Sequence, residues 1–111
     1  MGTSRSPDWS ATAELFSGRP NPVWPVPVAA AAELVSVWEQ LDPTDLVAVA
    51  PPLGYRGCVL RAPDGRTWRA FGGVVEFIHH GHVESRADEN RAFEGRLLNA
   101  APPGLVPPLP G

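Results

Sequence analysis

The fold is decided by the stretch YRGCVLRAPDGRTWRAF, residues 55–71. Two apolar-rich runs, residues 55–61 and 66–71, stand on either side of the sequence Ala62-Pro63-Asp64-Gly65. Proline presets the first turn angle, aspartate fits the second position, and glycine accepts the positive φ of a bulged hairpin turn. The stretch therefore predicts two antiparallel strands joined by a tight turn.

The register of this hairpin follows from pairing Ala62 with Arg66. That pairing places Leu60 opposite Trp68 on the face that we expect to be core, since side chains alternate between the two faces of a strand. The remaining pairs are Cys58 with Ala70 on the core face, and Val59 with Arg69 and Arg61 with Thr67 on the half-solvated face.

Before the hairpin, the pattern indicates a strand, a proline-rich segment and a helix. Residues 9–16 alternate between apolar and polar, which is typical of a half-buried strand. The prolines at positions 20, 22, 25 and 27 lack the N–H that a sheet requires, so we expect the sheet to stop there. A helix over residues 27–41 follows, ended by Asp42-Pro43. Its apolar stripe consists of Ala31, Leu34, Val35, Trp38 and Leu41.

A connector over residues 42–54 comes next, with 46–49 as a possible short strand. Beyond the hairpin, Gly72-Gly73 is expected to bend or bulge the chain before a strand over residues 74–79. Gly81 then predicts a turn into a short return strand.

The last element is a helix over residues 89–100, with Asp88 as its N-cap. Its apolar stripe is Phe93, Leu97 and Leu98. Together the segments predict an α+β fold, in which a small antiparallel sheet of about four strands packs against two helices in the order β-α-(β)-β-β-β-α. We expect residues 1–8 to be a flexible N-terminus, 9–100 a single domain and 101–111 a proline-rich extended tail.

Composition narrows the function. The chain has 111 residues, which suits one domain, and a net charge of −3, which argues against a nucleic-acid binder. The single cysteine excludes an internal disulfide and fits a reducing compartment. No apolar run resembles a signal peptide or a membrane span, so we expect a soluble cytoplasmic protein without a cofactor. Monomer and homodimer stay open.

The three histidines form a cluster, His79-His80-Gly81-His82. If His80-Gly81 is a two-residue turn, His79 and His82 are directly opposed and could share a zinc or copper ion, with His80 or Glu84 as a third ligand. An exposed polar turn is the stronger interpretation, because no CxxC or HExxH pattern accompanies the histidines. We therefore expect no metal.

The proline-rich segment offers a more specific site. Arg19 provides a forked donor suited to a carboxylate or phosphate, and the prolines around it stiffen the loop. Arg19 and Asn21 could thus be preorganised for a ligand, or Arg19 could pair internally while Trp24 anchors the core. Arg56 and Tyr55, which precede the hairpin, and Arg91 near the last helix could join Arg19 at one site for an anion.

Three motifs carry a resemblance. They are Phe16-Ser17-Gly18-Arg19-Pro20-Asn21-Pro22-x-Trp24, Leu53-Gly54-Tyr55-Arg56-Gly57 and Asp88-x-x-Arg91-x-Phe93-Glu94-x-x-Leu97-Leu98. In this order they resemble a group of small uncharacterised bacterial and fungal proteins. The resemblance implies a shared fold over residues 14–98 and implies no activity.

Two functions are consistent with these residues. The first is a small binding or accessory protein that holds an anionic small molecule or a protein partner near residues 17–22; its candidate binding residues are Arg19, Asn21, Trp24, Tyr55 and Arg56. The second is a small cofactor-free enzyme, an isomerase, cyclase or hydrolase of a bacterial biosynthetic pathway, acting through a histidine or carboxylate. Its candidate catalytic residues are Glu14, Glu76, His79 and His82.

Overall fold

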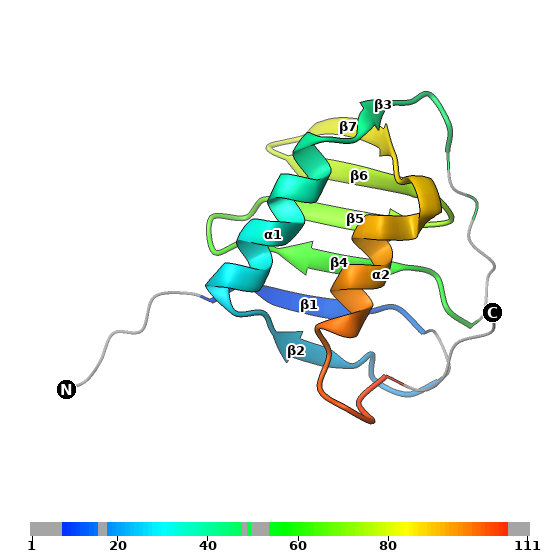
Figure 1. The fold of residues 1–111 in the computed structure, drawn as a ribbon. Coiled ribbons are helices and arrows are strands. Elements are labelled where there is room, and N and C mark those ends of the chain that lie inside the picture. The colour runs from blue at the N-terminus through cyan, green and yellow to red at the C-terminus, as the bar shows by residue number, and fades with distance from the viewer. Residues whose placement is uncertain (1–7, 16–17, 48, 50–53, 107–111) are drawn as a thin grey trace.

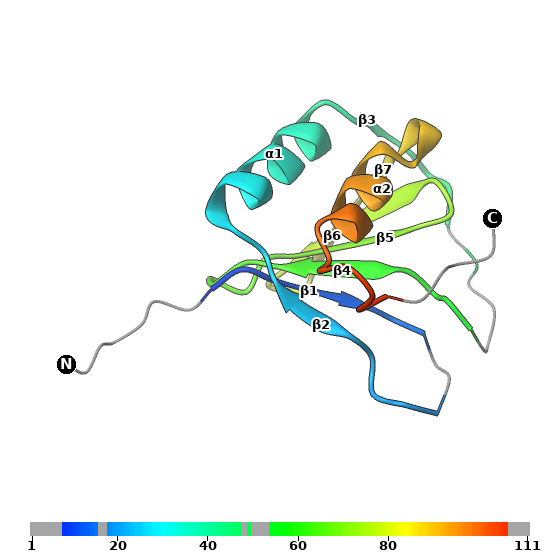
Figure 2. The same cartoon turned by 60° about the horizontal axis from the view of Figure 1, so that its bottom comes forward.

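The structure is a computed structural model that describes residues 8–15, 18–47, 49 and 54–106. Across these residues the chain forms a seven-stranded antiparallel sheet with two α-helices (Figure 1). Both helices cover the same face of the sheet (Figure 2). The predicted α+β class is confirmed, and the sheet is larger than the four or so strands expected.

The described residues form seven strands, one 3₁₀ turn and two α-helices. The strands are β1 Ser10–Ala13, β2 Val23–Pro25, β3 Asp42–Pro43, β4 Cys58–Arg61, β5 Thr67–Phe71, β6 Val74–His79 and β7 His82–Ala87. The helices are α1 Val28–Glu39, the 3₁₀ turn η1 Glu89–Arg91 and α2 Ala92–Asn99. Across the sheet the strands run in the order β2-β1-β4-β5-β6-β7-β3.

The hairpin of β4 and β5 has the predicted register. Leu60 lies opposite Trp68 and Cys58 opposite Ala70, and all four side chains are buried beneath the helices. The Ala62 N–H donates to the Arg66 carbonyl at 2.9 Å and closes the turn. The strand pattern and the turn residues specify the same pairing, which explains why this part of the prediction is correct.

One strand missed by the sequence reasoning is β2, which lies in the proline-rich segment. It pairs with β1 through Ala11 and Trp24. The prolines are compatible with it because β2 is an edge strand, where a missing N–H can face away from the sheet. The expectation that the sheet stops before residue 23 was therefore wrong.

At the other edge, β3 also contains a proline and pairs with β7. The Thr44 N–H extends this pairing by donating to the Ser85 carbonyl at 3.1 Å. The possible strand over residues 46–49 is absent at its described positions: Leu46, Val47 and Val49 are exposed, and residue 48 lies outside the described residues.

Two glycine-containing turns join β5, β6 and β7. Gly72 and Gly73 have φ of 61° and 89° and form a hairpin turn, so they reverse the chain rather than bulge it. His80 and Gly81, with φ of 52° and 78°, form the second turn and bring His79 opposite His82 as predicted.

The core lies between the sheet and the two helices. Helix α1 contributes Ala31, Leu34 and Trp38, and α2 contributes Phe93 and Leu97. After α2, the Leu105 N–H donates to the Pro102 carbonyl, so the described part of the tail contains a turn where we expected extended chain; residues 107–111 lie outside the described residues. Of the segment expected to be flexible, the structure describes only Asp8. Among the described helices, neither α1 nor α2 has the length and apolar character needed to span a membrane.

Candidate functional site

The loop that carries Arg19 is tied to the carboxyl end of β1. The Ala13 N–H donates to the Pro22 carbonyl at 3.1 Å, and the Leu15 N–H donates to Asn21 Oδ1 at 3.0 Å. Arg19 itself is exposed. The Asn21 oxygen that could have met a ligand therefore holds the loop against the sheet.

The segment before β4 lies on the other side of β1. The Glu14 N–H donates to the Gly57 carbonyl at 2.8 Å, and the Arg56 N–H donates to the Glu14 carbonyl at 2.7 Å. Tyr55 and Arg56 are half-buried. The loops that carry Arg19 and Arg56 thus flank one strand end, as the hypothesis of a shared site requires.

Trp24 does not belong to this site. Its side chain is 1% exposed and packs in the core cluster beneath the helices. The alternation of β2 explains this position, because Val23 and Pro25 face outward on either side of it. A ligand cannot reach Trp24, so its inclusion among the binding residues is corrected.

Tyr55 and Glu94 link the second and third motifs. The Tyr55 hydroxyl donates a hydrogen bond to Glu94 Oε2. Glu94 is only 3% exposed although it is charged by type, and it lies in the first turn of α2. The Tyr55 ring also contacts Phe71, with ring centroids 5.7 Å apart. Glu94 belongs to the third sequence motif, but no role was predicted for it. Its position beside the apolar stripe of a short helix was the one sequence signal that could have indicated a buried carboxylate.

Asp88 holds the start of α2 in place. Its two side-chain oxygens accept hydrogen bonds from the N–H groups of Phe93 and Glu94, at 2.8 and 3.1 Å. Asp88 was predicted as the N-cap of a helix that begins at residue 89, but α2 begins at Ala92 and its N-cap residue is Arg91. Asp88 instead precedes the 3₁₀ turn η1, and its side chain accepts from the first turn of α2. Asn90 and Arg91 lie between them in left-handed backbone conformations, which side chains other than glycine adopt rarely.

Burial shifts the acidity of three side chains in this cluster. It raises the pKa of the Glu94 carboxyl above its usual range, and the hydrogen bond from Tyr55 and the charge of Arg91 oppose that shift. Burial likewise raises the pKa of Tyr55. The Cys58 thiol is fully buried, donates weakly to the Glu94 carbonyl at 3.9 Å, and has its pKa raised by burial to about 12. It is a packed thiol and not a nucleophile.

The four candidate catalytic residues form two separate pairs, Glu14 with Glu76 beside Arg69 and His79 with His82. Glu14 forms a salt bridge with Arg69, and Glu76 lies opposite Arg69 in the neighbouring strand. His79 and His82 are paired at the opposite end of the sheet, beside the β6–β7 turn. None of the four lines the clefts found at Trp9 or beside α1 and α2.

The geometry adds no support for a metal at the histidines. The rings of His79 and His80 lie 4.0 Å apart between centroids, and His82 is exposed. Within the part of the chain that the structure describes, no group of three or more His, Cys, Asp or Glu side chains is placed to hold a metal ion.

Comparison with family models, with curated proteins and with solved structures finds no match to this chain.

Proposed function

We propose that the chain is a small binding protein that holds an anionic group at the carboxyl end of β1. The observation that carries the proposal is Arg19, an exposed arginine two positions before Asn21, whose side chain accepts a hydrogen bond from the Leu15 N–H. A donor next to an anchored segment loses less conformational freedom on binding than one on a mobile segment, so more of the interaction energy appears as affinity.

The stiffness of the loop comes from two sources. Pro20 and Pro22 restrict the backbone on either side of Asn21, and the Asn21 side chain is itself anchored to the Leu15 N–H. Arg19 therefore sits beside a rigid segment. Its planar fork suits the two oxygens of a carboxylate or phosphate.

Arg56 and Tyr55 supply the second wall of the proposed site. The backbone bond from Arg56 to Glu14 places their loop next to the same strand end as the Arg19 loop. The Tyr55 hydroxyl is engaged by Glu94, so Tyr55 borders the site without adding a donor to it, and Arg56 contributes positive charge. Asn21 contributes by shaping the loop.

A titration monitored by two-dimensional amide NMR tests this proposal. We expect inorganic phosphate and citrate, added at constant ionic strength, to shift the backbone amide signals of Gly18, Arg19 and Asn21 and those of residues 54–57. Arg19→Gln should weaken binding about tenfold, since it removes a charge-assisted hydrogen bond. Arg61→Gln is the matched control, because Arg61 is an exposed arginine at the opposite end of the sheet. Equal weakening by both variants, or the absence of shifts at these loops, contradicts the proposal.

A small acid–base enzyme is a second candidate, and Glu94 is the observation that favours it. A buried carboxyl whose pKa is raised keeps its proton to a higher pH than an ordinary glutamate and can act as a general acid, and Tyr55 would orient it. Titration of the Glu94 side-chain carbon signal by NMR tests this candidate. A pKa within the ordinary range for glutamate removes the support for it.

A further inference from the structure

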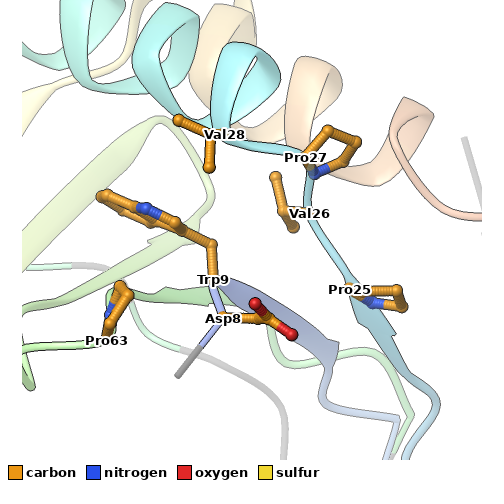
Figure 3. A pocket seen from close by; sticks show the side chains of 7 residues that line it. All are labelled: Asp8, Trp9, Pro25, Val26, Pro27, Val28 and Pro63. Carbon is orange, nitrogen blue, oxygen red and sulfur yellow. The ribbon is translucent and has the colours of Figure 1, made fainter. Parts of the chain in front are cut away.

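An apolar cleft opens at the amino end of β1, at the opposite end of the strand from the loops that carry Arg19 and Arg56 (Figure 3). It has a volume of about 490 Å³, which lies in the range of small-molecule sites. The start of β1, the connection from β2 to α1 and the β4–β5 turn all contribute to it. Its lining residues are Asp8, Trp9, Pro25, Val26, Pro27, Val28 and Pro63.

The Trp9 wall of the cleft is held in position. The indole of Trp9 stacks on Trp68, with ring centroids 5.8 Å apart and planes at 25°. The Arg66 guanidinium lies 5.6 Å from the Trp9 ring, and its charge is balanced by Asp64 at 2.9 Å. Trp9 is therefore supported by its neighbours and does not need a ligand to order it.

The backbone that forms the floor of the cleft and the wall opposite Trp9 is also held in position. Val26 is buried and its N–H donates to the Trp9 carbonyl at 3.0 Å, which fixes the separation of β1 from the chain that enters α1. Pro25 and Pro27 limit the backbone on each side of Val26. The cleft is thus largely formed before any ligand arrives.

The charge of the cleft indicates which ligand it fits. Asp8 is the one ionisable residue among the seven that line it, and Figure 3 shows its carboxylate on the side of the chain toward Pro25, with the Trp9 ring on the other side. We propose that the cleft binds a small apolar primary amine. The aromatic or branched body of the amine packs between Trp9, Val26 and Val28, and its ammonium group pairs with the Asp8 carboxylate.

The same chemistry disfavours the other occupants. An apolar anion of equal size would meet the Asp8 carboxylate as a like charge. Proline-rich peptides are recognised by grooves that present several aromatic rings to the prolines of the ligand. Here the protein supplies Pro25, Pro27 and Pro63, with Trp9 as the one aromatic side chain.

Three ligands with the same phenyl body test the charge preference. Calorimetric titration of the full chain at pH 7 should show that 2-phenylethylamine binds more tightly than 2-phenylethanol, and that 3-phenylpropanoate binds most weakly. Asp8→Asn should weaken the amine about tenfold and leave the alcohol unchanged. Equal affinities for the three ligands, or an unchanged amine affinity in Asp8→Asn, overturn the proposal.

A second variant tests whether the amine binds in this cleft, without disturbing the core. Val28 is 73% exposed, so Val28→Lys should fold normally while its positive charge weakens the amine and strengthens the carboxylate. Ser36→Lys, at an exposed position about two turns farther along the same helix, is the matched control and should change neither affinity. The same loss in both variants overturns the assignment to this cleft. Binding of a proline-rich peptide without binding of the amine also overturns it.

Discussion

At the carboxyl end of β1, the side chains of Tyr55, Asp88 and Glu94 are joined to one another or to the α2 backbone by hydrogen bonds. At the amino end of the same strand, Trp9 and Val28 border an open cleft. The first end is built from the residues of the three sequence motifs. The second is built from residues that lie outside them.

The difference shows that a distinctive sequence and a concave surface need not coincide. Trp24, Phe93 and Leu97 pack in the core, and Asn21 anchors a loop. The motifs therefore mainly specify how the elements join. Of the motif side chains, Arg19 is exposed and makes the strongest case for contact with a ligand.

The largest expected effect is that of Trp24→Ala, which tests whether this motif residue is part of the core. We expect a loss of about 4 kcal/mol in the free energy of unfolding, because a fully buried indole is replaced by a cavity. Urea denaturation measures it. Trp24→Phe should lose much less, since it keeps a ring and removes a buried indole N–H that has no partner among the described residues. A Trp24→Ala protein as stable as the wild type would contradict the assignment of this motif residue to the core.

Gly57 and Gly54 belong to the same motif but differ in how closely other atoms pack against them. A Cβ at Gly57 would lie 2.8 Å from the Ala70 carbonyl oxygen, and its φ is +126°. Gly57→Ala should therefore cost about 3 kcal/mol in the free energy of unfolding.

Gly54 is the matched control for that substitution. Its φ is +85°, but among the described residues no atom beyond its chain neighbours lies within 4 Å of the position that a Cβ would occupy. Gly54→Ala should cost only about 1 kcal/mol, from backbone strain alone. If the two variants lose the same stability, close packing against β5 is not what requires glycine at position 57.

The sequence was sufficient wherever local pattern and turn chemistry agreed. The β4–β5 register follows from Pro63-Asp64-Gly65 together with alternating side chains, and the pairing of His79 with His82 follows from Gly81. The edge strands were not predictable in this way. A proline within β2 or β3 is acceptable only at an edge, and which strands lie at an edge depends on the whole sheet.

The candidate site was harder to predict than the fold. Glu94 is hydrogen-bonded to Tyr55, which is separated from it by 39 residues, and no local pattern contains that contact. The cleft at Trp9 depends on three separate segments that meet at one end of the sheet. Such contacts are long-range, so neither composition nor periodicity could indicate them.

A smaller effect is expected from the Tyr55–Glu94 pair. Tyr55→Phe should lose about 1 kcal/mol in the free energy of unfolding, as is usual for one hydrogen bond. It should also raise the pKa of Glu94 further, because the bond from Tyr55 lowers that pKa. A Glu94 pKa that is unchanged in Tyr55→Phe would contradict the contact.

The pH dependence of stability follows from the same shift. The folded protein holds the Glu94 proton more tightly than the unfolded chain, in which glutamate has its ordinary pKa of 4.5. This contribution to stability is complete below pH 4.5 and is lost as the pH rises through the folded-state pKa. The stability of the wild type relative to Glu94→Gln should therefore fall as the pH rises above 4.5. A constant difference, measured by urea denaturation across that range, would contradict the raised pKa.

The smallest effect belongs to the open end of β1. Val28→Ser should change the free energy of unfolding by less than about 0.5 kcal/mol, because the Val28 side chain is 73% exposed and serine is well tolerated in the first turn of a helix. Thermal unfolding measures this, and binding of 2-phenylethylamine to the same variant should weaken because apolar contact area is lost. A variant that loses binding but not stability separates this end from the hydrogen-bonded end, where the fold depends on the side chains themselves. A large loss of stability would instead mean that the cleft supports the fold as Tyr55 and Glu94 do.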